Sequence, residues 1–84
     1  MREIRSTSRY QRRLETFLDK HPDLEELIES LVDRIAAGNA RAHALHGPLK
    51  GYHAARVSQS YRLIFALEPD AVVFIDIGAH DDVY

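Results

Sequence analysis

The sequence predicts a single α+β domain in which two helices pack on one face of a small antiparallel sheet. Three observations support this prediction: apolar residues at helical spacing in the first half, three β-rich segments in the second half, and short links between those segments. The chain has 84 residues, 45% hydrophobic and 29% charged, which suits one hydrophobic core and is too short for two. We therefore expect one domain over residues 1–84 with the element order βααβββ.

A short strand and a helix are expected at the N-terminus. The segment REIRST, residues 2–7, begins with the alternation of polar and apolar residues that is typical of a strand. Ser8 and Gln11 fit a capping box at the start of a helix. Apolar residues then recur at helical spacing, namely Tyr10, Leu14, Phe17 and Leu18.

The second helix has the most regular pattern in the chain. Pro22 suits its first position, because the missing N–H would have no partner there. Acidic residues follow in the first turn, where they favour the positive end of the helix dipole, and Gly38 is a typical stop. The apolar stripe of this helix comprises Leu24, Leu27, Ile28, Leu31, Val32 and Ile35.

Three strands are expected after the helices: YHAARVS (52–58), YRLIFAL (61–67) and AVVFIDI (71–77). The links around SQS and EPD are so short that they require hairpins, so the three strands form an antiparallel meander. The face of this sheet away from the helices is expected to be open to a ligand. The predicted core consists of Leu14, Phe17, Leu31, Ile35, Leu63, Phe65, Val73 and Ile75.

Charge is unevenly distributed along the chain. The formal net charge is −2, yet no Asp or Glu occurs from Arg34 to Leu67. Such a segment favours a local cationic surface for an anionic ligand, and the alternative is a solvated loop that happens to be basic. The segment contains Arg34, Arg41, Lys50, Arg56 and Arg62, together with His43, His46 and His53.

Several classes of protein are excluded or disfavoured. The absence of cysteine excludes disulfides and thiolate chemistry. No run of about 18 apolar residues occurs and the first residues lack the apolar stretch of a signal peptide, so we expect a soluble, cytoplasmic protein with no membrane partner. The pair His43 and His46 lacks a third ligand at a diagnostic spacing. We therefore expect no metal and no cofactor.

The C-terminal segment IDIGAHDDVY places a histidine, two aspartates and a tyrosine directly after the last expected strand. His80 and Tyr84 would put an imidazole and a phenol at the end of the sheet, where they are either catalytic groups or a polar tail.

The order βααβββ, the stretch HALHGPLKGYHAARVSQSYRLIF (43–65) and the ending IGAHDDVY (77–84) resemble the RelE/ParE toxin superfamily of bacterial toxin–antitoxin systems. The likeness covers essentially the whole chain and is strongest to the RelE and YafQ type of mRNA endonuclease. It implies a toxin that cleaves messenger RNA on the ribosome without a metal, through attack of the 2′-hydroxyl on the scissile phosphate. It also implies neutralisation by a cognate antitoxin and contact with operator DNA through the toxin–antitoxin complex.

The resemblance also implies roles for individual residues. His80 matches a catalytic histidine, and Tyr84 an aromatic that stacks on a base or assists proton transfer. Arg62 matches an arginine that contacts the scissile phosphate, and Arg56 and His43 match further positions of the catalytic site. Lys50, Arg41 and Tyr61 are assigned to RNA binding.

The likeness has one clear departure. Ser60 stands where the YafQ-type pattern has an aspartate, so no free carboxylate base is expected near the arginines and the site looks like a hybrid of two types.

Structural alternatives exist for every assignment. Arg56 and Arg62 would otherwise be outward sheet residues or antitoxin contacts, His43 a loop residue that binds carbonyls, and Tyr61 an edge-strand packing residue. Two other functions fit the same superfamily. One is a ParE-type inhibitor of DNA gyrase that acts by binding, and the other is an inactive member that only binds its antitoxin.

Overall fold

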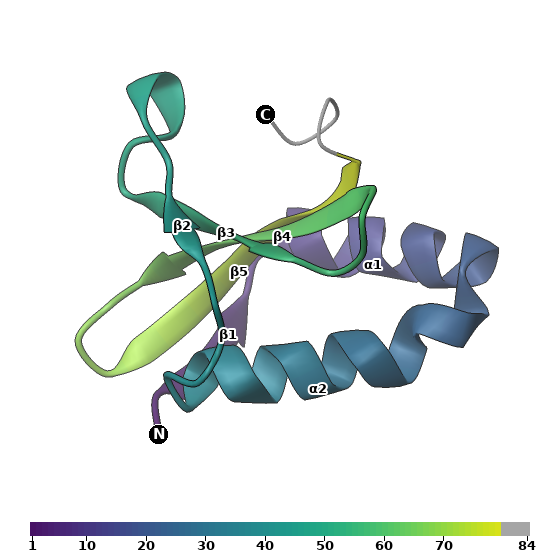
Figure 1. The fold of residues 1–84 in the computed structure, drawn as a ribbon, viewed down its shortest axis with the longest axis horizontal. Coiled ribbons are helices and arrows are strands. Elements are labelled where there is room, and N and C mark those ends of the chain that lie inside the picture. Colours follow the sequence, from purple (N-terminus) through teal and green to yellow (C-terminus); the bar gives the residue numbers. More distant parts are fainter. Residues whose placement is uncertain (80–84) are drawn as a thin grey trace.

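The computed structural model describes residues 1–79 of the chain. Both helices lie on one side of a single five-stranded sheet, and the loop between β2 and β3 rises on the other side (Figure 1). The predicted α+β class and the two-layer arrangement are therefore confirmed. The elements are β1 (Glu3–Ser6), α1 (Ser8–Lys20), a 3-10 turn (Pro22–Leu24), α2 (Glu25–Ala36), β2 (His43–Ala44), a second 3-10 turn (Gly47–Leu49), β3 (Tyr52–Arg56), β4 (Tyr61–Leu67) and β5 (Ala71–Ala79).

The sheet contains the predicted meander and two further features. Strands β3, β4 and β5 pair antiparallel through tight turns, whereas β1 pairs parallel with β5, so the sheet is mixed and not wholly antiparallel. The direction of β1 is not fixed by a hairpin, because most of the chain separates it from β5. The strand β2, which was not predicted, pairs with β3 at the far edge in the order β1-β5-β4-β3-β2.

Helix α1 begins one residue earlier than the capping box predicted. Its N-cap is Thr7, whose Oγ1 accepts a hydrogen bond from the Tyr10 N–H at 3.0 Å. The same hydroxyl donates to the carbonyl oxygen of Ile75 at 3.3 Å, so it ties the start of the helix to β5. The Gln11 amide donates instead to the Ser6 hydroxyl at 2.9 Å.

Helix α2 ends where the sequence predicts. Gly38 has a φ of +79°, which favours glycine. Its N–H donates to the Ile35 carbonyl oxygen at 3.1 Å, and the Asn39 N–H donates to that of Arg34 at 2.8 Å, which together form a Schellman motif. At the other end, Pro22 opens the 3-10 turn and not α2 itself.

A β-bulge in β5 decides which of its side chains enter the core. Phe65 pairs with Phe74 but Ile64 pairs with Asp76, which leaves Ile75 as an extra residue. The core prediction for Val73 and Ile75 was therefore wrong. The other predicted positions are buried, apart from Leu14, which is partly buried against the core. The core cluster comprises Tyr10, Phe17, Ile28, Leu31, Ile35, Ala36, Ala55, Val57, Leu63, Phe65, Val72, Phe74 and Ile77.

Candidate functional site

The sheet face away from the helices is only partly open. Ala54 and Ile64 are buried on this face, and Leu45, Tyr52 and Ile75 pack against them. Leu45 comes from the loop between β2 and β3, so this loop covers one end of the face. The expectation of a fully open face was wrong in this respect. The free part lies at the other end, where β3 stops and β4 begins.

Arg56 and Arg62 lie directly opposite each other at this free end. They are cross-strand partners, so their side chains share a face. Like charges placed opposite repel each other, and the two side chains are used differently. The Arg62 Nη1 donates to the carbonyl oxygens of Ser58 and Tyr61, both at 3.0 Å, and of Gln59 at 3.3 Å. Arg56 is exposed, and no carboxylate within residues 1–79 forms an ion pair with either arginine.

The end of β5 runs beside these arginines. Gly78 pairs with Arg62, and Ala79 pairs with Tyr61. Since Gly78 has no side chain, nothing from its position covers the face that Arg62 uses. Residue 80 follows Ala79 directly, but His80 and Tyr84 lie outside the described residues. Their catalytic assignments therefore stay predictions.

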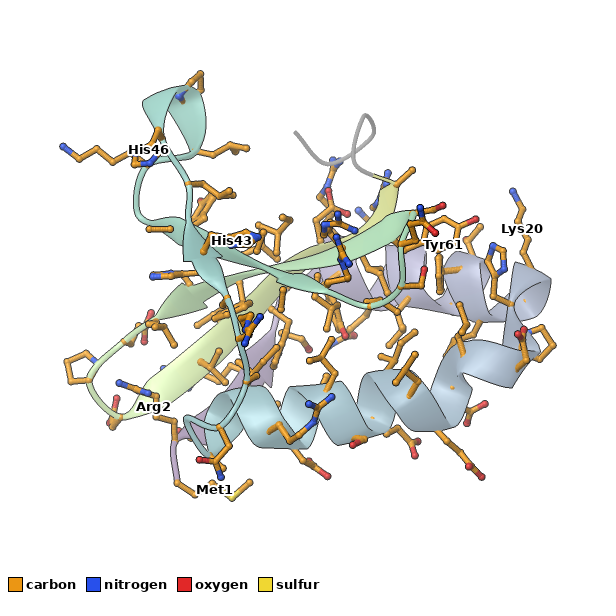
Figure 2. The ribbon with its side chains drawn as sticks, viewed as in Figure 1. Met1, Arg2, Lys20, His43, His46 and Tyr61 are labelled. Carbon is orange, nitrogen blue, oxygen red and sulfur yellow. The ribbon has the colours of Figure 1, made fainter. Side chains whose placement is uncertain are left out.

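A hollow of about 380 Å³ brings together three of the predicted site residues. Arg41, His43 and Arg56 line it at the β2–β3 edge of the sheet, together with Leu31 and Arg34 of α2. His43 lies on β2 and is exposed (Figure 2). Arg34 was not predicted as a site residue, although it is the first basic residue of the segment that lacks acids.

Two predicted residues lie elsewhere. Lys50 precedes β3 and is therefore at the opposite end of this strand from Arg56. Tyr61 faces the helices, because successive side chains of a strand alternate between the two faces. Its ring contacts Phe17 edge-on at a centroid distance of 4.9 Å and His21 at 4.9 Å. The structure thus separates Tyr61 from the face that Arg56 and Arg62 share.

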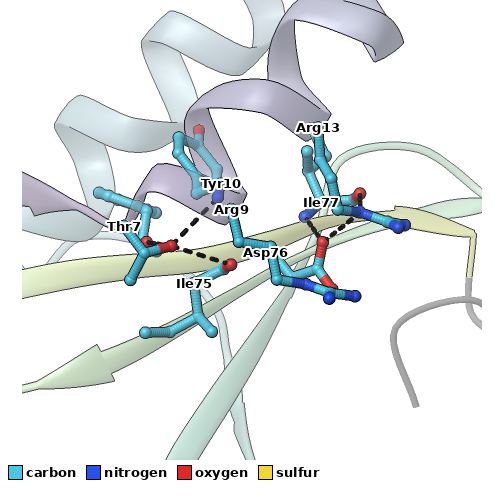
Figure 3. A network of polar contacts seen from close by, with 8 residues as sticks. Thr7, Arg9, Tyr10, Arg13, Ile75, Asp76 and Ile77 are labelled. Atoms are coloured by element: carbon cyan, nitrogen blue, oxygen red, sulfur yellow. Dashed lines mark hydrogen bonds and ion pairs between the residues drawn. The ribbon is translucent and has the colours of Figure 1, made fainter.

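A buried carboxylate was missed by the sequence analysis. Asp76 is opposite Ile64 and is therefore a diagonal neighbour of Arg62 on the same face. Arg9 of α1 reaches its Oδ2 at 3.2 Å, Arg13 pairs with its Oδ1, and the Ile77 N–H donates to Oδ1 at 2.9 Å (Figure 3). A carboxylate does lie near the arginines, but three donors already occupy it. A lone acid within the apolar strand AVVFIDI was the available signal.

Two negative findings apply to residues 1–79. No group of three or more His, Cys, Asp or Glu side chains in this range is arranged to hold a metal ion. Neither described helix has the length and apolar character needed to cross a membrane.

A protein-family model matches nearly the whole chain. The model of the family "Bacterial toxin of type II toxin-antitoxin system, YafQ" matches residues 2–84. Among curated proteins, no sequence matches.

Solved structures of several bacterial toxins have a similar fold. A mutant of YafQ from Escherichia coli is 21% identical, with a TM-score of 0.87, covering 100% of this chain and 99% of that one. YafQ in the E. coli DinJ–YafQ toxin–antitoxin complex is 22% identical, with a TM-score of 0.85 and coverages of 99% and 97%. A YoeB/ParE toxin from Agrobacterium tumefaciens is 15% identical, with a TM-score of 0.79 and coverages of 93% and 98%. At these identities the likeness concerns the fold.

Proposed function

Since the chain belongs to the YafQ family of toxins of bacterial type II toxin–antitoxin systems, we propose that it cleaves messenger RNA on the ribosome. The observation that carries this proposal is the pair Arg56 and Arg62, which lie opposite each other without a carboxylate partner in residues 1–79. The pair adjoins the end of β5, from which the chain continues to His80 and Tyr84.

The proposed reaction uses only groups of the RNA and of the protein. The 2′-oxygen forms a bond to the adjacent phosphorus while the bond from phosphorus to the 5′-oxygen breaks, which leaves a 2′,3′-cyclic phosphate and a 5′-hydroxyl. The 2′-hydroxyl loses its proton and the leaving 5′-oxygen gains one. His80 takes part in this exchange, and Tyr84 stacks on a base or assists the transfer. Arg56 and Arg62 stabilise the negative charge that develops on the phosphorane, with His43 at the edge of the same surface. No cofactor takes part.

The turn between β3 and β4 supports the role of Arg62. The Nη1 of Arg62 donates hydrogen bonds to carbonyl oxygens of this turn, whereas the Nε and Nη2 of Arg62 make no hydrogen bond within the described residues. A guanidinium fixed by one nitrogen presents the remaining N–H groups to a phosphate in a set direction. Such fixed donors need little reorganisation when the charge develops.

The lack of a free carboxylate on the described surface supports the proposed dependence on the ribosome. Asp76 is the carboxylate nearest to Arg62 by register, and two arginines and a backbone N–H already bind it. Within residues 1–79 the face therefore offers cations without a free carboxylate base. We infer that the decoding site must orient the message, because positioning of this kind supplies much of the rate of such reactions.

The partners follow from the same proposal. In E. coli, YafQ forms a complex with DinJ, and we propose that this chain is neutralised by its own cognate antitoxin in the cytoplasm. The complex would also bring the toxin to operator DNA. Burial of apolar surface would supply much of the affinity for the antitoxin, at about 25 cal/mol per Å² before ordering costs.

Primer extension on a defined message in a translation extract tests the proposal. We expect cuts in phase with codons in the extract and almost none on the same RNA without ribosomes. Expression without an antitoxin should also arrest bacterial growth. Uncut message together with blocked supercoiling of a plasmid by gyrase would instead establish the ParE-type activity, and healthy growth at high soluble yield would indicate an inactive member.

A further inference from the structure

A second cationic cleft lies on the helix side of the sheet, away from Arg56 and Arg62. It has a volume of about 500 Å³ and lies between α1 and the adjoining ends of β4 and β5. Its cationic groups all come from α1: Arg12, Arg13 and Lys20. No carboxylate is among the described residues that line this α1 cleft. Its composition therefore favours an anionic ligand.

The exposed cations of the α1 cleft form a row. Arg12 and Lys20, with Thr16 between them, are spaced by four residues and so lie on one face of α1. Neither Arg12 nor Lys20 forms an ion pair with a carboxylate of residues 1–79. The Arg12 guanidinium and the Lys20 ammonium are thus available to two phosphates of one strand.

One wall of the cleft is aromatic. Phe17 and His21 have ring centroids 4.7 Å apart, and His21 and Tyr61 have centroids 4.9 Å apart. His21 and Tyr61 are only partly buried, so part of each ring remains accessible. A nucleobase can stack on such rings, because every base has a π-face. Cations beside an accessible aromatic wall are the combination that single-stranded nucleic acid requires.

The backbone beside the cleft disfavours an acidic peptide as the ligand. An extended peptide binds most readily by adding a strand to a free sheet edge. On this edge of β5, Thr7 already donates to the Ile75 carbonyl oxygen at 3.3 Å, and Arg13 Nε donates to that of Ile77 at 3.2 Å. A peptide strand would have to displace both side chains, whereas an RNA strand needs only the cations and the rings.

We propose that the α1 cleft is a second RNA-binding site, which holds one phosphate of the strand on Arg12, another on Lys20, and a base against His21. Ile77, Gly78 and Ala79 also line it, so it adjoins the strand end that leads to His80. The inference rests on the proposed function and extends it: the α1 cleft takes the part of the RNA strand next to the bond that is cut.

The test measures binding and not cleavage. A short fluorescent 2′-O-methyl RNA, which lacks the attacking hydroxyl, is titrated with the isolated protein at several KCl concentrations. The double variant R12A/K20A removes two cations from the cleft. The matched control R2A/R5A removes one cation just before β1 and one within it. Arg2 binds the Glu68 carbonyl oxygen, and Arg5 pairs with Glu3 and Glu68. Both variants change the net charge equally, and thermal unfolding verifies that each is folded.

We expect R12A/K20A to bind the RNA on the order of ten-fold more weakly at low salt, with a salt slope shallower by about 1.4 because two phosphate contacts are lost. The control should stay within about two-fold of the wild type, because distant exposed charges are screened. His21→Leu should weaken binding about 5- to 150-fold with the slope unchanged, since stacking is lost and not charge.

Equal effects of R12A/K20A and the control would overturn the inference, as would no measurable binding by the wild type. A poly-glutamate peptide serves as the acidic competitor. The inference would also be overturned if this peptide displaced the RNA from the wild type and if R12A/K20A weakened binding of the peptide more than binding of the RNA. Loss of RNA binding in R12A/K20A supports the second site even if primer extension shows no cleavage. The two proposals can therefore fail separately.

Discussion

The arginines of α1 and those of the β3–β4 hairpin show two opposite uses of the same side chain. Arg9 and Arg13 converge on the buried carboxylate of Asp76 and fasten α1 to β5. Arg56 and Arg62 lie opposite each other, and no carboxylate of residues 1–79 pairs with them. An arginine that pairs with a buried carboxylate stabilises the fold, whereas an arginine without such a partner is available to bind a ligand.

The largest expected effect concerns the residues proposed to act on RNA beside Arg56 and Arg62. His80→Gln and removal of Tyr84 should each lower codon-phased cleavage by about 10²–10⁴-fold, since a proton-transfer group supplies a factor of that size. Both positions follow β5 (Ala71–Ala79) in the sequence, and we expect the free energy of unfolding to change by no more than about 0.5 kcal/mol. Primer extension and urea unfolding measure the two quantities. If both variants stay fully toxic, the C-terminal segment is only a tail and gyrase becomes the first target to test.

The next largest effect concerns the arginines of α1 that pair with Asp76. Asp76→Asn leaves Arg9 and Arg13 without their carboxylate, and we expect it to lower the free energy of unfolding by about 2–3 kcal/mol. This estimate allows for the exposure of Arg9, whose side chain is 57% accessible. The control is Asp33→Asn, an exposed residue of α2, which should change stability by less than about 0.5 kcal/mol. If urea unfolding gave the same free energy of unfolding for both variants, the ion pairs of Asp76 would contribute nothing to stability.

A smaller effect should separate the two arginines of the hairpin. Arg62→Ala removes the donor that binds the turn carbonyls, so it should destabilise the fold by about 1 kcal/mol. Arg56→Ala removes an exposed charge that faces another cation, so stability should change by less than about 0.5 kcal/mol. Both substitutions should weaken cleavage. Urea unfolding beside primer extension distinguishes them, and a greater loss of stability for Arg56→Ala would contradict the assignment of Arg62 to the turn.

The smallest effect concerns a buried group that has no partner. The Tyr10 hydroxyl makes no hydrogen bond within the described residues, and burial raises the pKa of Tyr10 from 10.0 to about 12. Tyr10→Phe should therefore stabilise the fold at pH 7 by about 0.5 kcal/mol.

The pH dependence of this variant provides the control. Above pH 10 the unfolded tyrosine loses its proton before the folded one does, so the wild type loses stability as the pH rises towards 12. Tyr10→Phe should lack this part of the loss. Identical alkaline profiles for the two proteins in urea would contradict the buried environment of this hydroxyl.

The sequence predicted the elements with regular patterns and missed those that depend on distant contacts. The stripe of α2 and the β-rich segments of β4 and β5 have enough residues to show a period, whereas β2 has two residues and shows none. Alternation alone cannot locate a bulge, so the extra residue Ile75 reversed the predicted faces of β5. Thr7 and not Ser8 is the N-cap of α1, because the Thr7 hydroxyl also forms a hydrogen bond with β5.

The candidate site was predicted to a similar extent. The pairing of Arg56 with Arg62 follows from a short hairpin, which the sequence indicates. The ion pairs of Asp76 join residues more than sixty positions apart, and no local pattern reports them. Tyr61 was assigned to RNA binding by its place in a motif; strand alternation places it on the helix side, in the wall of the α1 cleft and away from Arg56 and Arg62. The roles of His80 and Tyr84 still rest on the resemblance alone.

The position of β5 in the sheet has a consequence for the synthesis of the protein. Among the described strands this one is made last, yet it lies between β1 and β4 and supplies Val72, Phe74 and Ile77 to the core. While it is still inside the ribosome, β1 has no partner and the core lacks these three side chains. The nascent chain therefore completes its fold only after β5 has left the ribosome that made it. The cationic hairpin of β3 and β4 precedes β5 in the chain, whereas the core is complete only once β5 has paired with both β1 and β4.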